Sequence, residues 1–145
     1  MQICFGFFFL AALVNGAGDA GKEDLKRLQG KWSVVERIVD GKKADIELLW
    51  TISENEISYG PAVGVWADFK VDATTKPKAI DINPVSKHDP KNMGKAIQGI
   101  YEIDGDTFKI CGPMEAEAKE RPMAFESKVG SGVTLIVLKR VKDMK

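Results

Sequence analysis

The stretch that decides the fold is residues 24–41, DLKRLQGKWSVVERIVDG. Leu25 and Leu28 have helical spacing, and Gly30 suits the left-handed conformation that ends a helix. After Gly30 the apolar period changes to two, as in a strand, until Asp40-Gly41 signals a turn. The stretch predicts a short helix, a glycine stop and a long strand. We expect this strand to present Trp32, Val34, Glu36 and Ile38 on one face and to bury all of these except Glu36.

The rest of the chain reads as short strands separated by turns about every 8–12 residues, the spacing of an all-β barrel. Asp104-Gly105 between alternating segments is the strongest hairpin signal and predicts that Tyr101 faces Phe108. Residues 133–141 are apolar on both faces, which favours a closing or central strand. We predict an all-β, antiparallel barrel of about eight strands with the helix closing one end. Strands are expected at 49–53, 56–59, 63–72, 79–83, 97–103, 106–111, 122–128 and 133–141.

Length and charge limit the class of protein. With 145 residues the chain has room for one domain, which we place at residues 22–141. Its 21 basic and 21 acidic residues balance. No strong field therefore steers nucleic acid or an anionic membrane toward it, and we expect neither as a partner.

Residues 1–18 are predicted to be a signal peptide. Ile3–Val14 carries no charge and has the length of a signal-peptide core, which is too short for a membrane span. Small residues follow, so cleavage after Gly16 or Gly18 fits. The start lacks Lys and Arg, and an uncleaved anchor is the alternative. We expect a secreted protein, extracellular or periplasmic, with no membrane attachment after the leader is removed.

Removal of the leader determines how many cysteines the mature chain has. Removal of Cys4 leaves Cys111 alone in the mature chain, so the fold has no internal disulfide. A dimer through Cys111 is one reading of an unpaired cysteine, and an unreactive side chain on a strand is the other.

Several segments together resemble a known family. They are Gly30-Lys31-Trp32 after the helix, residues 77–82 (PKAIDI), residues 99–107 (GIYEIDGDT), and residues 120–140 with their Gly130-Ser131-Gly132 turn. In order, they are similar to the lipocalin-like domain of unknown function that is widespread in planctomycete bacteria. The resemblance implies a calycin-type barrel and no known reaction. It also implies that Arg140 packs over Trp32, with Gly30, Trp32 and Arg140 as structural residues.

The sequence contains no recognisable catalytic or metal-binding pattern. His88 and Cys111 lie far apart and no ligand spacing occurs, so no metal or cofactor is expected. Ser131 lies between glycines but lacks the Gly-x-Ser-x-Gly elbow of hydrolases. We therefore predict that the protein is not an enzyme.

Ligand binding is the function that the residues favour. Aromatic side chains on the predicted strands can line a cavity, although they can equally fill a small barrel, and we favour a filled or nearly filled one. Arg121 is expected near a mouth, as an anion contact or a salt bridge. The predicted function is a binding or interaction module for a small apolar ligand or a protein partner. An extracellular structural component and an enzyme using the barrel mouth are the alternatives. The candidate ligand-binding residues are Trp66, Phe69, Tyr101, Phe108, Arg121 and Phe125.

Overall fold

The computed structural model describes residues 16–60, 64–85, 91, 93–113 and 120–142, with side chains from residue 20 onward. These residues form one helix and nine strands. The elements are α1 (Gly16–Leu28), β1 (Gly30–Val39), β2 (Lys42–Lys43), β3 (Leu49–Ser53), β4 (Glu56–Tyr59), β5 (Val65–Asp72), β6 (Lys78–Pro84), β7 (Ile97–Asp104), β8 (Thr107–Pro113) and β9 (Val133–Arg140).

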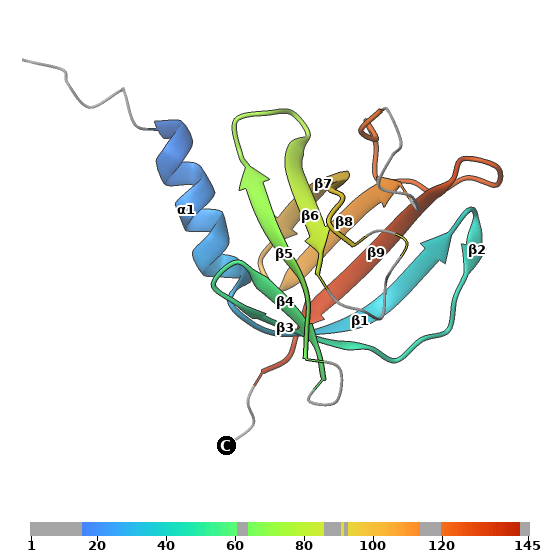
Figure 1. The fold of residues 1–145 in the computed structure, drawn as a ribbon, viewed down its shortest axis with the longest axis horizontal. Helices are drawn as coiled ribbons and strands as arrows, with labels where there is room; N and C mark the ends of the chain where they lie inside the picture. The colour runs from blue at the N-terminus through green and yellow to red at the C-terminus, as the bar shows by residue number, and fades with distance from the viewer. Residues whose placement is uncertain (1–15, 61–63, 86–90, 92, 114–119, 143–145) are drawn as a thin grey trace, which may run out of the picture.

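The strands form a closed barrel. From β3 to β9 each strand pairs antiparallel with the next, and β1 pairs with both β3 and β9. The two-residue strand β2 only adds to the edge of β1, so eight strands close the barrel. Figure 1 shows α1 beside β5 and β2 on the opposite side of the molecule. The predicted antiparallel, lipocalin-like barrel with a preceding helix is confirmed.

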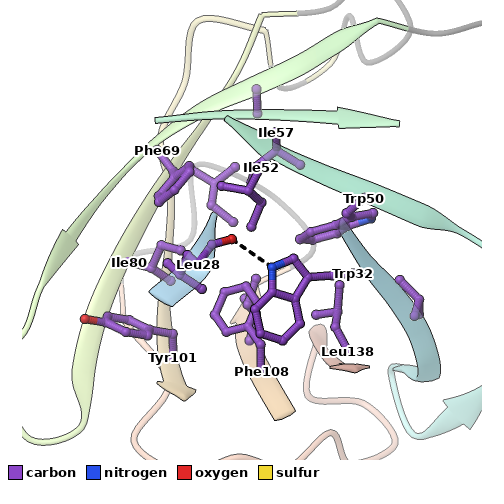
Figure 2. Close-up of a cluster of buried hydrophobic side chains, with 14 residues drawn as sticks. Leu28, Trp32, Trp50, Ile52, Ile57, Phe69, Ile80, Tyr101, Phe108 and Leu138 are labelled. Atoms are coloured by element: carbon purple, nitrogen blue, oxygen red, sulfur yellow. Dashed lines mark hydrogen bonds between the residues drawn. The ribbon is translucent and has the colours of Figure 1, made fainter. Parts of the chain in front are cut away.

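The core fills the half of the barrel nearest α1. Strand alternation directs large apolar side chains inward, and Leu28 reaches them from the end of the helix. Figure 2 shows Trp32 at the centre of this cluster, with its ring 5.5 Å from that of Phe108. The fully buried members include Leu28, Trp32, Trp50, Ile57, Ile80, Tyr101, Phe108 and Leu138.

A β-bulge changes which residues of β1 face inward. The pairing of β1 with β9 shifts between Val34 and Glu36, so Val35 is an extra residue. Arg37, and not Glu36, therefore lines the interior. The expectation that Glu36 and Ile38 continue the inner face was wrong. It assumed that successive side chains alternate without interruption, and the extra residue Val35 shifts this alternation by one position.

A second bulge lies in β5. The β4–β5 pairing advances one residue on β4 but two on β5, so Trp66 is the extra residue. Trp66 turns toward the interior, whereas Val65 is 41% exposed. Both bulges thus bring a long side chain into the same half of the barrel.

The β7–β8 hairpin has a different register from the predicted one. Asp104 pairs with Thr107, so the turn residues are Gly105 and Asp106. Gly105 has φ of 57°, which glycine at the first position of a type II′ turn adopts without strain. The predicted inner face is unchanged, but the cross-strand pairs are Tyr101–Ile110 and Ile103–Phe108.

Two other segments differ from expectation. The helix has 13 residues and begins at Gly16, so it is longer than one or two turns. Residues 122–128 form no strand; they cross the outer face of β6–β8, where Ala79, Ile100 and Cys111 are buried. The predicted leader up to residue 15 and His88 lie outside the described residues. In the described part of the chain, no helix has the length and apolarity that a membrane span needs.

Candidate functional site

The end of the barrel next to α1 is closed by polar contacts as well as by packing. The carbonyl oxygen of Leu28 accepts a hydrogen bond from Trp32 Nε1 at 2.8 Å, the dashed line in Figure 2. Arg140 donates to the carbonyl oxygens of Gln29, at 2.9 Å, and Arg27. Its guanidinium carbon lies 4.3 Å from the centroid of the Trp32 ring, which is the contact that the sequence predicted. These bonds satisfy carbonyl groups that a helix end leaves without partners.

Asp24 adds a buried polar cluster at the same end. Its carboxylate is 2% exposed and accepts hydrogen bonds from the Tyr101 hydroxyl at 2.7 Å and from Lys78 Nζ at 2.8 Å. Burial, followed by the bond to Asp24, raises the pKa of Tyr101 above its ordinary range. A tyrosine held neutral in this way is no proton acceptor at physiological pH, so the cluster fastens α1 to β6 and β7.

The opposite half of the barrel contains a cavity of about 160 Å³, which we call the barrel cavity. Trp50, Ile82 and Ile110 belong to the core and also line this cavity, so they separate the two halves. All eight barrel strands contribute to the cavity wall. Four isoleucines supply most of the apolar lining, and three aromatic residues and one arginine complete it with small residues from β8 and β9. The lining residues are Arg37, Trp50, Tyr59, Trp66, Ile82, Ile97, Ile110, Gly112, Pro113, Thr134 and Ile136.

Three aromatic rings form one side of the barrel cavity. Tyr59 and Trp66 are stacked, with ring centroids 4.8 Å apart and an interplanar angle of 17°. Trp50 is tilted against both, at 5.6 Å from Tyr59 and 6.1 Å from Trp66. Trp50 and Tyr59 meet because they are direct cross-strand partners in the β3–β4 hairpin. The result is a flat aromatic wall in an otherwise aliphatic cavity.

Two buried N–H donors of the wall lack acceptors. Among the described residues, Arg37 Nε and Trp50 Nε1 are the buried side-chain polar atoms without a hydrogen-bond partner. Leaving such a donor unpaired costs about 1–3 kcal/mol. Both donors belong to residues that line the barrel cavity, so the unfavourable free energy of the two unpaired groups is associated with this cavity.

The sequence-predicted aromatic residues divide between the two halves of the barrel. Trp66 lines the barrel cavity. Phe69, Tyr101 and Phe108 are each at most 2% exposed and belong to the core near α1. The structure therefore brings one of these four to the cavity and uses the other three as packing.

Arg121 and Phe125 lie on the outside of the barrel. Arg121 donates to the carbonyl oxygens of Ile80, at 3.1 Å, and Gly99, at 2.7 Å, and pairs with Asp81 at 2.8 Å. Of the two predicted roles for Arg121, an anion contact or a salt bridge, the structure shows the salt bridge. Its bonds join the segment that begins at residue 120 to β6 and β7. Phe125 borders a separate surface depression next to Pro77 and Lys78.

Cys111 is completely buried on the outer face of β8. Its sulfur lies 3.5 Å from the carbonyl oxygen of Glu126, in the segment that crosses this face. Burial raises the pKa of the Cys111 thiol. The environment favours the unreactive alternative, because thiolate chemistry needs exposure and a lowered pKa.

Arg37, Trp50 and Tyr59 were missed as site residues. The partnership of Trp50 and Tyr59 was available from sequence, because a two-residue turn at Glu54-Asn55 sets these two opposite each other. The inward position of Arg37 was not, since it depends on a bulge that no turn residue marks.

A larger groove of about 570 Å³ runs between α1 and β5. Its lining comes from α1, from β5 with the turn that follows it, and from Asn55 in the β3–β4 turn. The barrel cavity is the better candidate because residues from every barrel strand surround it. Among the described residues, no group of three or more His, Cys, Asp or Glu side chains is placed to hold a metal ion.

Comparison of the chain with family models, curated proteins and solved structures gives no match. The resemblance to the lipocalin-like domain stays a prediction.

Proposed function

We propose that the protein is a secreted binding module that holds a small apolar ligand in the barrel cavity and does not transform it. The observation that carries the proposal is a cavity walled by apolar and aromatic side chains from all eight barrel strands. Small-molecule sites typically combine such walls with a few polar groups that orient the ligand. Secretion is proposed from the uncharged segment at residues 3–14 and the small residues after it.

The volume restricts the ligand to a small one. A cavity of about 150 Å³ accepts a single benzene ring, and the barrel cavity has about 160 Å³. A mid-sized fluorescent probe is too large for it, so a single-ring compound is the suitable test molecule.

Titration with toluene, followed by NMR of the isoleucine methyl groups, tests the proposal. We expect saturable shifts at Ile82, Ile97, Ile110 and Ile136, and unchanged toluene after long incubation. Ile136→Trp fills the cavity and is expected to abolish the shifts. Val137→Trp places the same ring on the outer face of β9 and is expected to leave them unchanged.

A wild-type protein that binds no single-ring compound would refute the ligand-holding function. A protein-interaction or structural role through the outer surface of the barrel would then be the better proposal. Conversion of the probe would instead favour an enzyme that uses the barrel mouth.

A further inference from the structure

Arg37 is a cation in an apolar cavity. Of the residues that line the barrel cavity in the described part of the chain, it is the one with a charged side chain. Its guanidinium makes no hydrogen bond or ion pair with any described residue, and the neighbouring carboxylates of Glu36, Asp45 and Glu47 are not within salt-bridge distance. Arg37 is partly buried, and its Nε–H is fully buried without an acceptor, so an anionic group in the cavity would supply the acceptor that this donor lacks.

The geometry of a guanidinium specifies which anion fits well. Arg37 Nε is one of its unpaired donors, and Nε together with one terminal nitrogen forms a fork that matches the two oxygens of a carboxylate. Trp50, which is 1% exposed, contributes a second buried N–H without an acceptor. Two buried donors on residues that line the same cavity, with no carboxylate in the lining, favour a ligand that carries acceptors and negative charge.

The rest of the cavity specifies the body of the ligand. The stacked pair Tyr59 and Trp66 offers a flat face, and isoleucines from β6 to β9 enclose the remainder. The volume of about 160 Å³ leaves room for one ring and excludes a long acyl chain.

We propose that the barrel cavity binds a small single-ring aromatic monocarboxylate, with its carboxylate on Arg37 and the Trp50 N–H and its ring against Tyr59 and Trp66. This assignment rests on the proposed function and names the chemical class of its ligand. This binding mode depends on the β-bulge at Val35, because the bulge turns Arg37 inward in place of Glu36.

Binding of benzoate, benzamide and toluene to the purified protein by calorimetry and NMR tests the assignment. The three probes share a ring and differ in charge and acceptor groups. We expect benzoate to bind at least about tenfold more tightly than toluene, with benzamide between them, because a charge-assisted bidentate pair is stronger than a neutral hydrogen bond. The Arg37 Nε–H resonance should shift with benzoate and not with toluene.

Three variants locate the carboxylate. Arg37→Gln is expected to remove most of the preference for benzoate, measured as the ratio of benzoate to toluene affinity in the same variant. Arg37→Lys keeps the charge without the fork and should give an intermediate result. Trp50→Phe removes one donor and also alters the aromatic wall, so it should weaken benzoate binding more than toluene binding and lower the ratio of the two affinities. Lys31→Gln, which removes a charge from an exposed position of the same strand, is the matched control.

The outcomes separate this assignment from the function on which it rests. If toluene binds as tightly as benzoate, the carboxylate assignment is wrong and the binding function stands. If benzoate is preferred but Arg37→Gln retains the preference, the carboxylate lies elsewhere and the assignment is again wrong. If neither probe binds, both proposals fail. Should Arg37→Gln not fold, the Arg37 Nε–H shift in the wild-type protein decides.

Discussion

At the scale of single residues, Arg140 joins three parts of the molecule. Its guanidinium stacks on the Trp32 ring, donates to carbonyl groups at the end of α1, and lies 3.4 Å from Asp106 in the β7–β8 turn. Planarity and five donors make this combination specific to arginine. The residue therefore couples the helix, the core and a distant turn through one side chain.

Trp32→Ala and two Arg140 variants measure this coupling. Trp32→Ala is expected to lower the free energy of unfolding by about 3–5 kcal/mol, because it removes a fully buried aromatic ring. Arg140→Ala should cost less. Arg140→Lys should cost nearly as much as Arg140→Ala, because the flat group that stacks and forks is lost. Urea unfolding followed by circular dichroism gives the values.

Lys142→Ala is the control for the charge of Arg140. Lys142 also pairs with Asp106, at 3.2 Å, but its side chain is 76% exposed, so we expect a change of at most about 1 kcal/mol. A Trp32→Ala protein that melts within about a degree of wild type would contradict the central position of this ring.

Tyr101 predicts how stability depends on alkaline pH. Burial and the bond to Asp24 raise its pKa above the ordinary value of 10.0. The folded state holds the phenolic proton more tightly than the unfolded state does. The resulting contribution to the free energy of unfolding is complete below the unfolded-state pKa and is lost as the pH rises past it. In a Cys111→Ala background, which removes the other group with a raised pKa in the described part of the chain, unfolding free energies should fall from pH 10 upward. Adding Tyr101→Phe should lower stability at pH 7 and flatten the alkaline fall; an unchanged slope would contradict this role.

At the scale of elements, two glycines differ in how much space the neighbouring strand leaves for a side chain. A Cβ added at Gly99 in β7 would lie 2.7 Å from the carbonyl oxygen of Cys111 in β8, which is backbone and cannot give way cheaply. A Cβ added at Gly112 in β8 would lie 3.5 Å from the Cα of Gly99, which is an ordinary contact. The two positions face each other across the same strand pair.

Gly99→Ala should therefore lower the unfolding free energy by about 1–3 kcal/mol through a steric clash. Gly112→Ala should be neutral within about 0.5 kcal/mol or slightly stabilising, because alanine loses less backbone entropy than glycine on folding. Chemical unfolding of the two variants side by side gives the comparison. Equal costs would show that the close approach of β7 and β8 is not what requires Gly99.

At the scale of the whole molecule, closure divides the barrel into two halves with different uses. The half near α1 is filled by large side chains and closed by the helix end, whereas the other half retains the barrel cavity. The hydrogen bonds and core contacts that join α1, with the residue that follows it, to the barrel come from Asp24, Leu25, Arg27, Leu28 and Gln29. Residues before Asp24 are not among those that supply these bonds.

Removal of the leader should therefore leave the barrel intact. Intact-mass measurement on protein from the native host is expected to show a chain that begins between Ala17 and Gly21, because the small residues there suit cleavage. Such a chain keeps every contact named above. Recovery of the full-length chain in membranes would contradict both the secretion proposal and the mature start.

The sequence by itself determined the architecture and the closed end. Alternation of apolar residues, the Gly30 stop and the turn signals are local, so they indicate the strands and their number without a structure. The Trp32–Arg140 contact was implied by the family resemblance. The local patterns also place Tyr101 and Phe108 on the inner face, although the turn moved by one residue because glycine suits the first position of a type II′ turn.

Only the tertiary structure decided which residues line the cavity. A bulge is fixed by how two strands pair after the barrel closes, and that pairing joins β1 to β9 about a hundred residues away in the chain. A single extra residue reverses every side chain beyond it. Closure thus brought Arg37 and Trp66 into the lining that also holds the Trp50–Tyr59 pair, while Phe69, Tyr101 and Phe108, three predicted site residues, pack in the core near α1.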